Sequence, residues 1–469
     1  MPNPKAKFPI ILLASLAIKV LSINTGFFWD NVLLGSRVAH FFFENGFSCW
    51  YLPVEMDSGH PPLFGYTLAI WWKVFGPTLL SSHLFMLPFV FGVIWQLHNT
   101  ASFFFQNSRD RVLALILILA DPTLSSQMVL INPDLPQLFL FLLALNGLLR
   151  GKKLLLGLGL AFLGLASYRG MMLCAGIVAI DLALNLLVSK KGFKSFFSAP
   201  RILTYLAGFA PAIIYVGWRY LEVGWIVSSP IDPHEGGHYQ VAQISSMLRN
   251  IVVIAHRFAD FGRVFLYLFV AGIIARNILR KESLKQYLPL AFIFVLSTSA
   301  IWITSVFINN PLGHRYFIPS YIPLGLIAYK MLLTTKWPRM GFSLITVALL
   351  SGNLWVYPDR IAQGWDSSLA HLNYWPVRQK AISFMEENQI EVNNTGTFFP
   401  NITSSQMIML DGKTESFPAF SGSEKYALYS NVYNLTDREF DLLEINYRPI
   451  KTFNNKGVRI VLYEKVNLY

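Results

Sequence analysis

Residues 27–64 read FFWDNVLLGSRVAHFFFENGFSCWYLPVEMDSGHPPLF, a segment that is both polar and aromatic. It follows an apolar run directly and carries Asp30 near its start, with three more carboxylates at Glu44, Glu55 and Asp57. These charges make the segment too polar to cross a bilayer, while its aromatic residues suit the membrane–water interface. We therefore predict an interfacial loop with short helices that carries a reactive carboxylate.

The apolar run before this loop, residues 8–27, is long enough to cross a bilayer, which takes about 20 residues. Lys5 and Lys7 precede it, and cationic flanks favour the cytoplasmic side. Because the run lacks the small-x-small pattern of a cleaved signal peptide, we expect it to be retained as the first membrane helix. This topology places the N-terminus in the cytoplasm and the 27–78 loop on the outer face.

The chain as far as residue 357 alternates apolar segments with short polar loops. The full chain of 469 residues is 54% hydrophobic, and its 38 Lys and Arg against 26 Asp and Glu give a formal charge of +12. The basic residues gather in the loops predicted to be cytoplasmic, so they indicate membrane orientation and argue against nucleic-acid binding. We predict a polytopic α-helical membrane protein with about eleven spans over residues 1–357. After the first, the predicted spans are residues 79–105, 111–131, 135–149, 154–166, 171–188, 202–221, 261–275, 287–308, 316–333 and 341–357.

A second polar stretch, residues 222–260, is also predicted on the outer face and contains three histidines, His234, His238 and His256. Their spacing lacks the tight pattern of a zinc site. A polar loop without a metal fits better, and the same loop could gate access of a substrate. The two cysteines, Cys49 and Cys174, indicate neither a disulfide framework nor a cysteine-based metal site.

Residues 358–469 have an ordinary soluble composition and are predicted to form a small α/β domain on the outer face. Pro376 falls in the first turn of an amphipathic helix over 375–388. Thr436 and Glu439 have the spacing of a capping box. The runs 448–453 and 458–464 flank Asn-Asn-Lys-Gly, which is typical of a hairpin, and 426–430 is strand-like.

Ionisable residues recur at the predicted outer ends of separate spans. Because charge at membrane depth is costly, such residues are candidates for function. They are Asp30, His60, Asp134, Arg169, the histidines of 222–260, and the Gly313-His314-Arg315-Tyr316 run.

Three short motifs occur among these residues in a fixed order. They are an Asp directly after the first span, then Gly-His-Pro-Pro-Leu at 59–63 and Asn-Pro-Asp-Leu-Pro at 132–136. A later Arg-Tyr-x-x-Pro-x-x-x-Pro pattern begins at Arg315. This layout over residues 8–357 resembles the GT-C glycosyltransferases. Within them it is similar to the dolichyl-phosphate-mannose–protein mannosyltransferase-like group, glycosyltransferase family 39, which includes the aminoarabinose transferases of lipid A.

The resemblance implies an inverting transfer of one hexosyl or pentosyl unit from a polyprenyl-phosphate donor to an acceptor hydroxyl outside the cytoplasm. Asp30 matches the position of the general base, which must accept the hydroxyl proton. The phosphate leaving group needs cationic stabilisation, and the planar fork of Arg315 suits its oxygens. Arg169, His60, His314 and Tyr316 are further candidates for contact with the donor phosphate. Asp134 is a second catalytic carboxylate that would orient the acceptor or hold a cation.

Each candidate also has a plain structural interpretation. Asp30 and Asp134 could cap the helices that follow them. His60 could be a turn residue before two prolines, and Arg169 or Arg315 could anchor a helix end at the interface. These alternatives stay open at the level of sequence.

The sequence also leaves a second class of function open, a transporter or flippase of lipid-linked sugars. Transporters often carry internal repeats and polar residues at the bilayer midplane, and neither feature is visible. A non-catalytic scaffold would leave the clustered outer charges unexplained. We expect a monomer in the cell membrane, with a lipid, glycan or protein acceptor. No cofactor is required by the sequence, although Asp30, His60 and Asp134 could hold Mg²⁺ or Mn²⁺.

Overall fold

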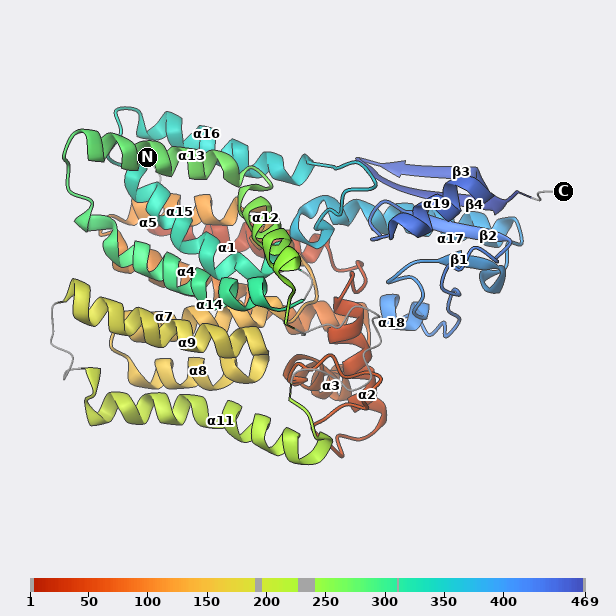
Figure 1. The fold of residues 1–469 in the computed structure, drawn as a ribbon, viewed down its shortest axis with the longest axis horizontal. Coiled ribbons are helices and arrows are strands. Elements are labelled where there is room, and N and C mark those ends of the chain that lie inside the picture. Colours follow the sequence, from red (N-terminus) through yellow and green to blue (C-terminus); the bar gives the residue numbers. More distant parts are fainter. Residues whose placement is uncertain (1–3, 190–195, 227–240, 310–311, 467–469) are drawn as a thin grey trace.

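The computed structural model describes residues 4–189, 196–226, 241–309 and 312–466 (Figure 1). A body of long helices occupies one side of the molecule, and a small sheet with its own helices extends from the other (Figure 1). The predicted combination of an α-helical body with a small C-terminal α/β part is confirmed.

The helical body contains α-helices joined by short π- and 3-10-helical turns. Their bounds are α1 Pro4–Leu21, η1 Val32–Arg37, α2 Val38–Glu44, α3 Leu63–Phe75, α4 Leu79–Phe104, α5 Ser108–Leu119, α6 Pro122–Val129, α7 Asp134–Leu149, α8 Lys153–Ala166, α9 Tyr168–Ala183, η2 Leu184–Val188, α11 Ala199–Val223, α12 Ile244–Ala259, α13 Arg263–Leu279, η3 Lys285–Tyr287, α14 Leu288–Phe307, η4 His314–Phe317, α15 Ile318–Leu332, α16 Pro338–Ser351 and η5 Gly352–Leu354.

Within the described residues, four helical segments are long and apolar enough to cross a membrane, and the number rises to six if two bent helix pairs each count as one span. Four shorter apolar helices accompany them, the longest of which is α7 with 16 residues. The number of about eleven membrane spans therefore stays a prediction.

The predicted span 111–131 is wrong as one continuous helix, because α5 and α6 meet at an angle of 79°. The break has a local cause. Asp121 has extended backbone, and its carboxylate accepts hydrogen bonds from the backbone N–H groups of Thr123 and Leu124, at 2.9 and 3.2 Å. Asp121 thus caps a new helix, and Pro122 fits its first position because proline needs no N–H partner there.

The stretch 222–260 was predicted as a polar loop, but its second half forms the helix α12. Ile244, Leu248 and Val252 recur every four residues and are exposed, so the helix turns an apolar stripe outward. The helix lies at 88° to α13, which follows it. An exposed apolar stripe on a helix nearly perpendicular to its neighbour is typical of a helix lying in the membrane interface. His234 and His238 lie outside the described residues.

The C-terminal part forms a four-stranded mixed sheet in the order β1-β2-β4-β3, in which only the β1–β2 pair is parallel. The predicted strand 426–430, the hairpin and the capping box of Thr436 and Glu439 are all present. The bounds are η6 Trp365–Ser367, η7 Leu369–Asn373, α17 Tyr374–Glu387, η8 Val392–Asn394, β1 Thr395–Thr397, α18 Ser405–Met409, β2 Tyr426–Ser430, α19 Asp437–Asn446, β3 Tyr447–Asn455 and β4 Val458–Lys465.

The C-terminal part is packed directly onto the start of the 27–78 loop. The backbone N–H of Phe27 donates to the carbonyl of Ile408 at 2.8 Å. A Cβ on Gly26 would lie 2.3 Å from that carbonyl oxygen, so only glycine allows this approach. The ring of Phe28 lies 5.1 Å from His371 and 5.8 Å from Tyr374. The segment that carries Asp30 is therefore held between the helical body and the C-terminal part.

Candidate active site

Arg315, on η4 between α14 and α15, lies among three carboxylates. Its Nη2 donates a hydrogen bond to Asp30, its Nε lies 3.0 Å from Asp134, and its Nη1 pairs with Asp366. These carboxylates come from the loop after α1, from the first turn of α7 and from η6. The structure therefore joins three distant parts of the chain at one guanidinium.

The guanidinium of Arg315 is almost fully enclosed, with only 6% of its side chain exposed. Burial alone would lower its pKa, but the negative charges of Asp30 and Asp134 raise the pKa above the ordinary arginine value. Arg315 is therefore a permanent cation that balances part of the surrounding negative charge. A buried arginine needs such partners, because an unpaired charge would be costly.

Asp30 is the most accessible of the three carboxylates. Its side chain is 37% exposed, against 5% for Asp134 and 10% for Asp366. The residue before it, Trp29, has φ 53°, a left-handed conformation that costs a bulky residue energy and is found more often at functional sites. Because η1 begins after Asn31 without a side-chain cap, and Asp30 bonds Arg315, the helix-capping interpretation of Asp30 is not seen.

Asp134 opens α7 but does not cap it either. The capping hydrogen bond comes from Asn132, whose side-chain oxygen accepts from the N–H of Leu135 at 2.8 Å. Asp134 instead lies 3.3 Å from Nη1 of Arg169, on α9. The guanidinium of Arg169 in turn stacks over the ring of Tyr316, 3.6 Å from its centroid. The predicted residues Asp30, Asp134, Arg169, Arg315 and Tyr316 are thus brought together.

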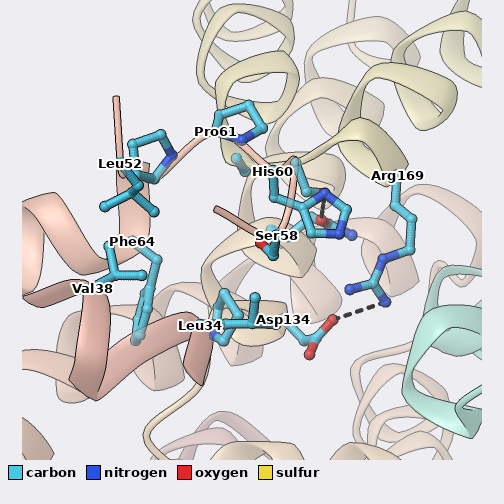
Figure 2. Close-up of a pocket in the computed structure, with 14 residues that line it drawn as sticks. Leu34, Val38, Leu52, Ser58, His60, Pro61, Phe64, Asp134 and Arg169 are labelled. Atoms are coloured by element: carbon cyan, nitrogen blue, oxygen red, sulfur yellow. Dashed lines mark hydrogen bonds and ion pairs between the residues drawn. The ribbon is translucent and has the colours of Figure 1, made fainter. Parts of the chain in front are cut away.

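A cavity lies on the Arg169 side of this cluster, and Figure 2 shows Asp134 and Arg169 joined at its edge. One wall is apolar and includes Leu34, Val38 and Phe64. The Nη1 atom of Arg169 is buried and makes no hydrogen bond, since its approach to Asp134 is not aligned. A buried cationic donor beside an apolar wall suits an anionic group attached to a lipid. The other lining residues are Leu52, Ser58, His60, Pro61, Pro62, Pro133, Gln137, Ala166 and Ser167.

His60 lines this cavity. Burial, together with the positive charges of Arg169 and Arg219, lowers the pKa of its imidazole to about 3. It is therefore neutral near pH 7 and can offer a phosphate a hydrogen bond but no charge. The loop that carries it is fixed by a buried ion pair, in which Asp57 lies 2.6 Å from Arg219 of α11.

His314 does not face the cluster, although Arg315 follows it directly. Its Nε2 lies 2.7 Å from Asp260, its ring packs 4.7 Å from Phe261, and its side chain is fully buried. Burial lowers the pKa of its imidazole to about 3, although the hydrogen bond to Asp260 acts in the opposite direction. The structure thus gives His314 a place in the packing beneath η4.

His256, the last of the predicted histidines, lies exposed on α12, with its ring 6.0 Å from Tyr357. Across the parts of the chain that the structure describes, no group of three His, Cys, Asp or Glu side chains is placed to hold a metal ion. Asp30, His60 and Asp134 are accordingly not gathered as a metal site, and the two carboxylates face Arg315 instead.

The residue that sequence reasoning missed is Asp366. It is 7% exposed and lies in a Gly-Trp-Asp-Ser-Ser run shortly after the last apolar segment. The only signal was an acidic residue flanked by a tryptophan and two serines near the predicted membrane surface. That pattern also fits an ordinary turn, so the contact with Arg315 emerges only from the fold.

Two crystal structures of ArnT from Cupriavidus metallidurans, one bound to undecaprenyl phosphate and one in the apo state, resemble this structure. Both superpose with a TM-score of 0.52 and cover 98% of each chain. The fold resembles that of ArnT throughout. Sequence identity is 13% to the bound form and 11% to the apo form. No protein-family model and no curated protein matches the sequence. At this level of identity the likeness to ArnT concerns the fold alone.

Proposed function

We propose that this protein is an inverting glycosyltransferase that moves one sugar from a polyprenyl-phosphate donor to an acceptor hydroxyl on the outer face of a membrane. The observation that carries the proposal is the accessible carboxylate of Asp30, held by Arg315, which Asp134 links to Arg169 at the edge of a cavity. The ArnT structure that holds undecaprenyl phosphate supports the same class of donor.

Asp30 is the proposed general base. The acceptor oxygen attacks the anomeric carbon as the bond from that carbon to the phosphate oxygen breaks. The acceptor proton passes to the Asp30 carboxylate, and the polyprenyl phosphate leaves with the bonding electrons. One displacement at the anomeric carbon inverts its configuration. A positioned base typically contributes about 10²–10⁴-fold to the rate.

Arg169 is the proposed contact of the donor phosphate. Arg315 already forms ion pairs with Asp30, Asp134 and Asp366, and these carboxylates balance its positive charge. Arg169 pairs with one carboxylate, Asp134, against three for Arg315, and its buried Nη1 makes no aligned hydrogen bond. A phosphate oxygen there would satisfy this donor and gain a charge-assisted hydrogen bond. Neutral His60 would supply a further hydrogen bond from the cavity wall.

Asp134 and Tyr316 support this arrangement. Asp134 bridges the two arginines, and the ring of Tyr316 lies under Arg169 and 5.3 Å from Arg315. Holding both guanidiniums in fixed orientations preorganises the site, so little reorganisation is needed when charge develops on the leaving phosphate.

The sugar, the acceptor and the orientation belong to the proposal as well. A hexosyl or pentosyl unit on a phosphate held at Arg169 would extend toward Asp30. The sheet and the loop between α13 and α14 lie at opposite ends of the helical body (Figure 1). That separation supports a cytoplasmic side at the basic loops and an outer side at the sheet.

The direct test is to incubate purified protein with undecaprenyl-phosphate hexoses and pentoses, each with a hydroxyl acceptor, and to measure undecaprenyl phosphate release. The proposal predicts release above a protein-free control for at least one donor. A carrier would move the lipid across vesicles without releasing the phosphate. No release from any donor, together with such movement, would contradict the proposed transfer.

A further inference from the structure

We propose that Asp366 is a positioning residue of this site, through which the C-terminal part of the chain fixes Arg315 and hence the Asp30 carboxylate. The inference rests on the proposed function, because positioning matters only if Asp30 reacts. Asp366 itself is not placed to touch the acceptor, since its carboxylate is turned to Arg315 and only 10% of its side chain is exposed.

Asp366 is held rigidly by hydrogen bonds to its backbone and its side chain. Its backbone carbonyl accepts two hydrogen bonds from α6, from Ser126 Oγ at 2.6 Å and from Gln127 Nε2 at 2.7 Å. Its own Oδ1 accepts a third from Ser367 at 3.0 Å. A carboxylate whose backbone and side chain are both bonded can fix the orientation of a guanidinium.

The helix α6 that supports Asp366 is itself anchored at both ends by buried polar side chains. Asp121 caps its first turn and lies 3.0 Å from Arg263. At the other end, Lys19 of α1 donates to the carbonyls of Val129 and Leu130, at 2.7 and 3.0 Å. The negative group at the N-terminus complements the helix dipole, and the Lys19 hydrogen bonds satisfy two carbonyls at the C-terminus. Helix α6 is thus a fixed platform between α1 and α13.

The C-terminal part contacts both the backbone before Asp30 and the arginine that binds its side chain. Phe27 is bonded to Ile408, and the ring of Trp29 lies 5.6 Å from Phe399. Asp366 then reaches Arg315, which holds Asp30 itself. The backbone before Asp30 and the cation that binds its side chain are therefore set by the same part of the chain. Without the Asp366 carboxylate, Arg315 would keep two ion-pair partners, Asp30 and Asp134, and its guanidinium could change orientation.

The test compares Asp366→Asn with Asp359→Asn in the donor-release assay. Asp359 is the matched control, because it forms another Asp–Arg pair in the same connecting segment, with Arg459 and away from the site. We expect Asp366→Asn to lower kcat about ten-fold or more with the donor KM within about two-fold, and Asp359→Asn to leave kcat unchanged. Equal losses in the two variants, or wild-type kcat for Asp366→Asn, would overturn the inference.

A double-mutant cycle with Arg315→Lys shows whether Asp366 acts through the arginine. Coupled residues give non-additive effects, so the loss from Asp366→Asn should largely vanish in the Arg315→Lys background. A loss of the same size in both backgrounds would overturn the inference. If Asp366→Asn does not fold, Asp366→Glu keeps the charge but moves the carboxylate by one methylene, and wild-type kcat for that variant would overturn it as well.

Hydrogen–deuterium exchange gives a readout that does not depend on activity. Exchange over residues 27–44 should be faster in Asp366→Asn than in Asp359→Asn, and equal rates would overturn the positioning role. If the wild-type protein releases no polyprenyl phosphate, the proposed function fails while exchange still tests the positioning of Asp30. The two failures are therefore distinguishable.

Discussion

Asp30 and Arg315 are 285 positions apart in the chain, yet the Nη2 of Arg315 donates a hydrogen bond to the Asp30 carboxylate. The contact joins the loop after the first helix to the turn before α15. It orients an accessible carboxylate at the edge of the charged cluster, where a general base would act.

Arg169 should contribute to donor binding more than to protein stability. We expect Arg169→Ala to raise the donor KM about ten-fold or more, because the leaving phosphate loses its buried cationic donor. Arg201→Ala is the matched control, since Arg201 also lies 3.3 Å from a buried aspartate and near an aromatic ring, but at the other end of the body. The donor KM of both variants is obtained from initial rates measured at a series of donor concentrations. An unchanged KM in Arg169→Ala would mean that Arg169 has a structural role only.

Gly26 should be needed for docking of the C-terminal part. We expect Gly26→Ala to lower the melting temperature and the transfer rate together, because its Cβ would collide with the carbonyl of Ile408. Gly217→Ala is the control, since nothing lies within 4 Å of its added Cβ in the C-terminal half of α11. Tryptophan fluorescence recorded during thermal unfolding in detergent gives the melting temperatures of the two variants. Equal melting temperatures for both variants would contradict the tight approach.

Protein stability should fall as the pH drops below about 6.5. Burial lowers the pKa of His60 and His314 to about 3 and that of His371 to about 4. Between the lowered values and the ordinary value of 6.5, the unfolded chain binds more protons than the folded chain, so stability increases with pH there and levels off above it.

Melting temperatures measured from pH 4.5 to 8 test this expectation. His314→Gln should flatten the dependence, because one buried imidazole no longer takes up a proton on unfolding. His256→Gln serves as the control, since His256 is exposed. A melting temperature that is constant over the whole range would contradict burial of these three neutral histidines.

The predicted orientation can be tested with single cysteines at exposed serines. Ser283→Cys lies in the basic loop between α13 and α14, and Ser421→Cys lies beside the sheet. In a background that lacks Cys49 and Cys174, a membrane-impermeant maleimide should label position 421 in intact cells and position 283 only after permeabilisation. Labelling of both positions from the same side would refute the orientation.

Much of the site followed from the sequence because its residues lie at the ends of apolar segments. Asp30, Asp134, Arg169 and Arg315 each begin or follow such a segment, and alternation of spans places these ends on one side. The C-terminal elements were predictable for a local reason, since a capping box and a tight hairpin are encoded within a few residues.

The remaining features depend on tertiary packing that no local pattern encodes. Asp366 reaches Arg315 only because the chain after α16 crosses over α6. His314 was assigned to the donor site by its place beside Arg315, but Asp260 turns its ring into the core. The break before α6 arises because Asp121 caps a helix in the middle of an apolar run.

The central claim is that Asp30 removes the acceptor proton, and the Asp30→Asn variant tests it most directly. Release of undecaprenyl phosphate should fall about 10²–10⁴-fold, with donor binding and the melting temperature near wild type, because asparagine keeps the shape and loses the base. Glu44→Gln, an exposed carboxylate of the same loop, should retain full activity. Wild-type release by Asp30→Asn would contradict the account.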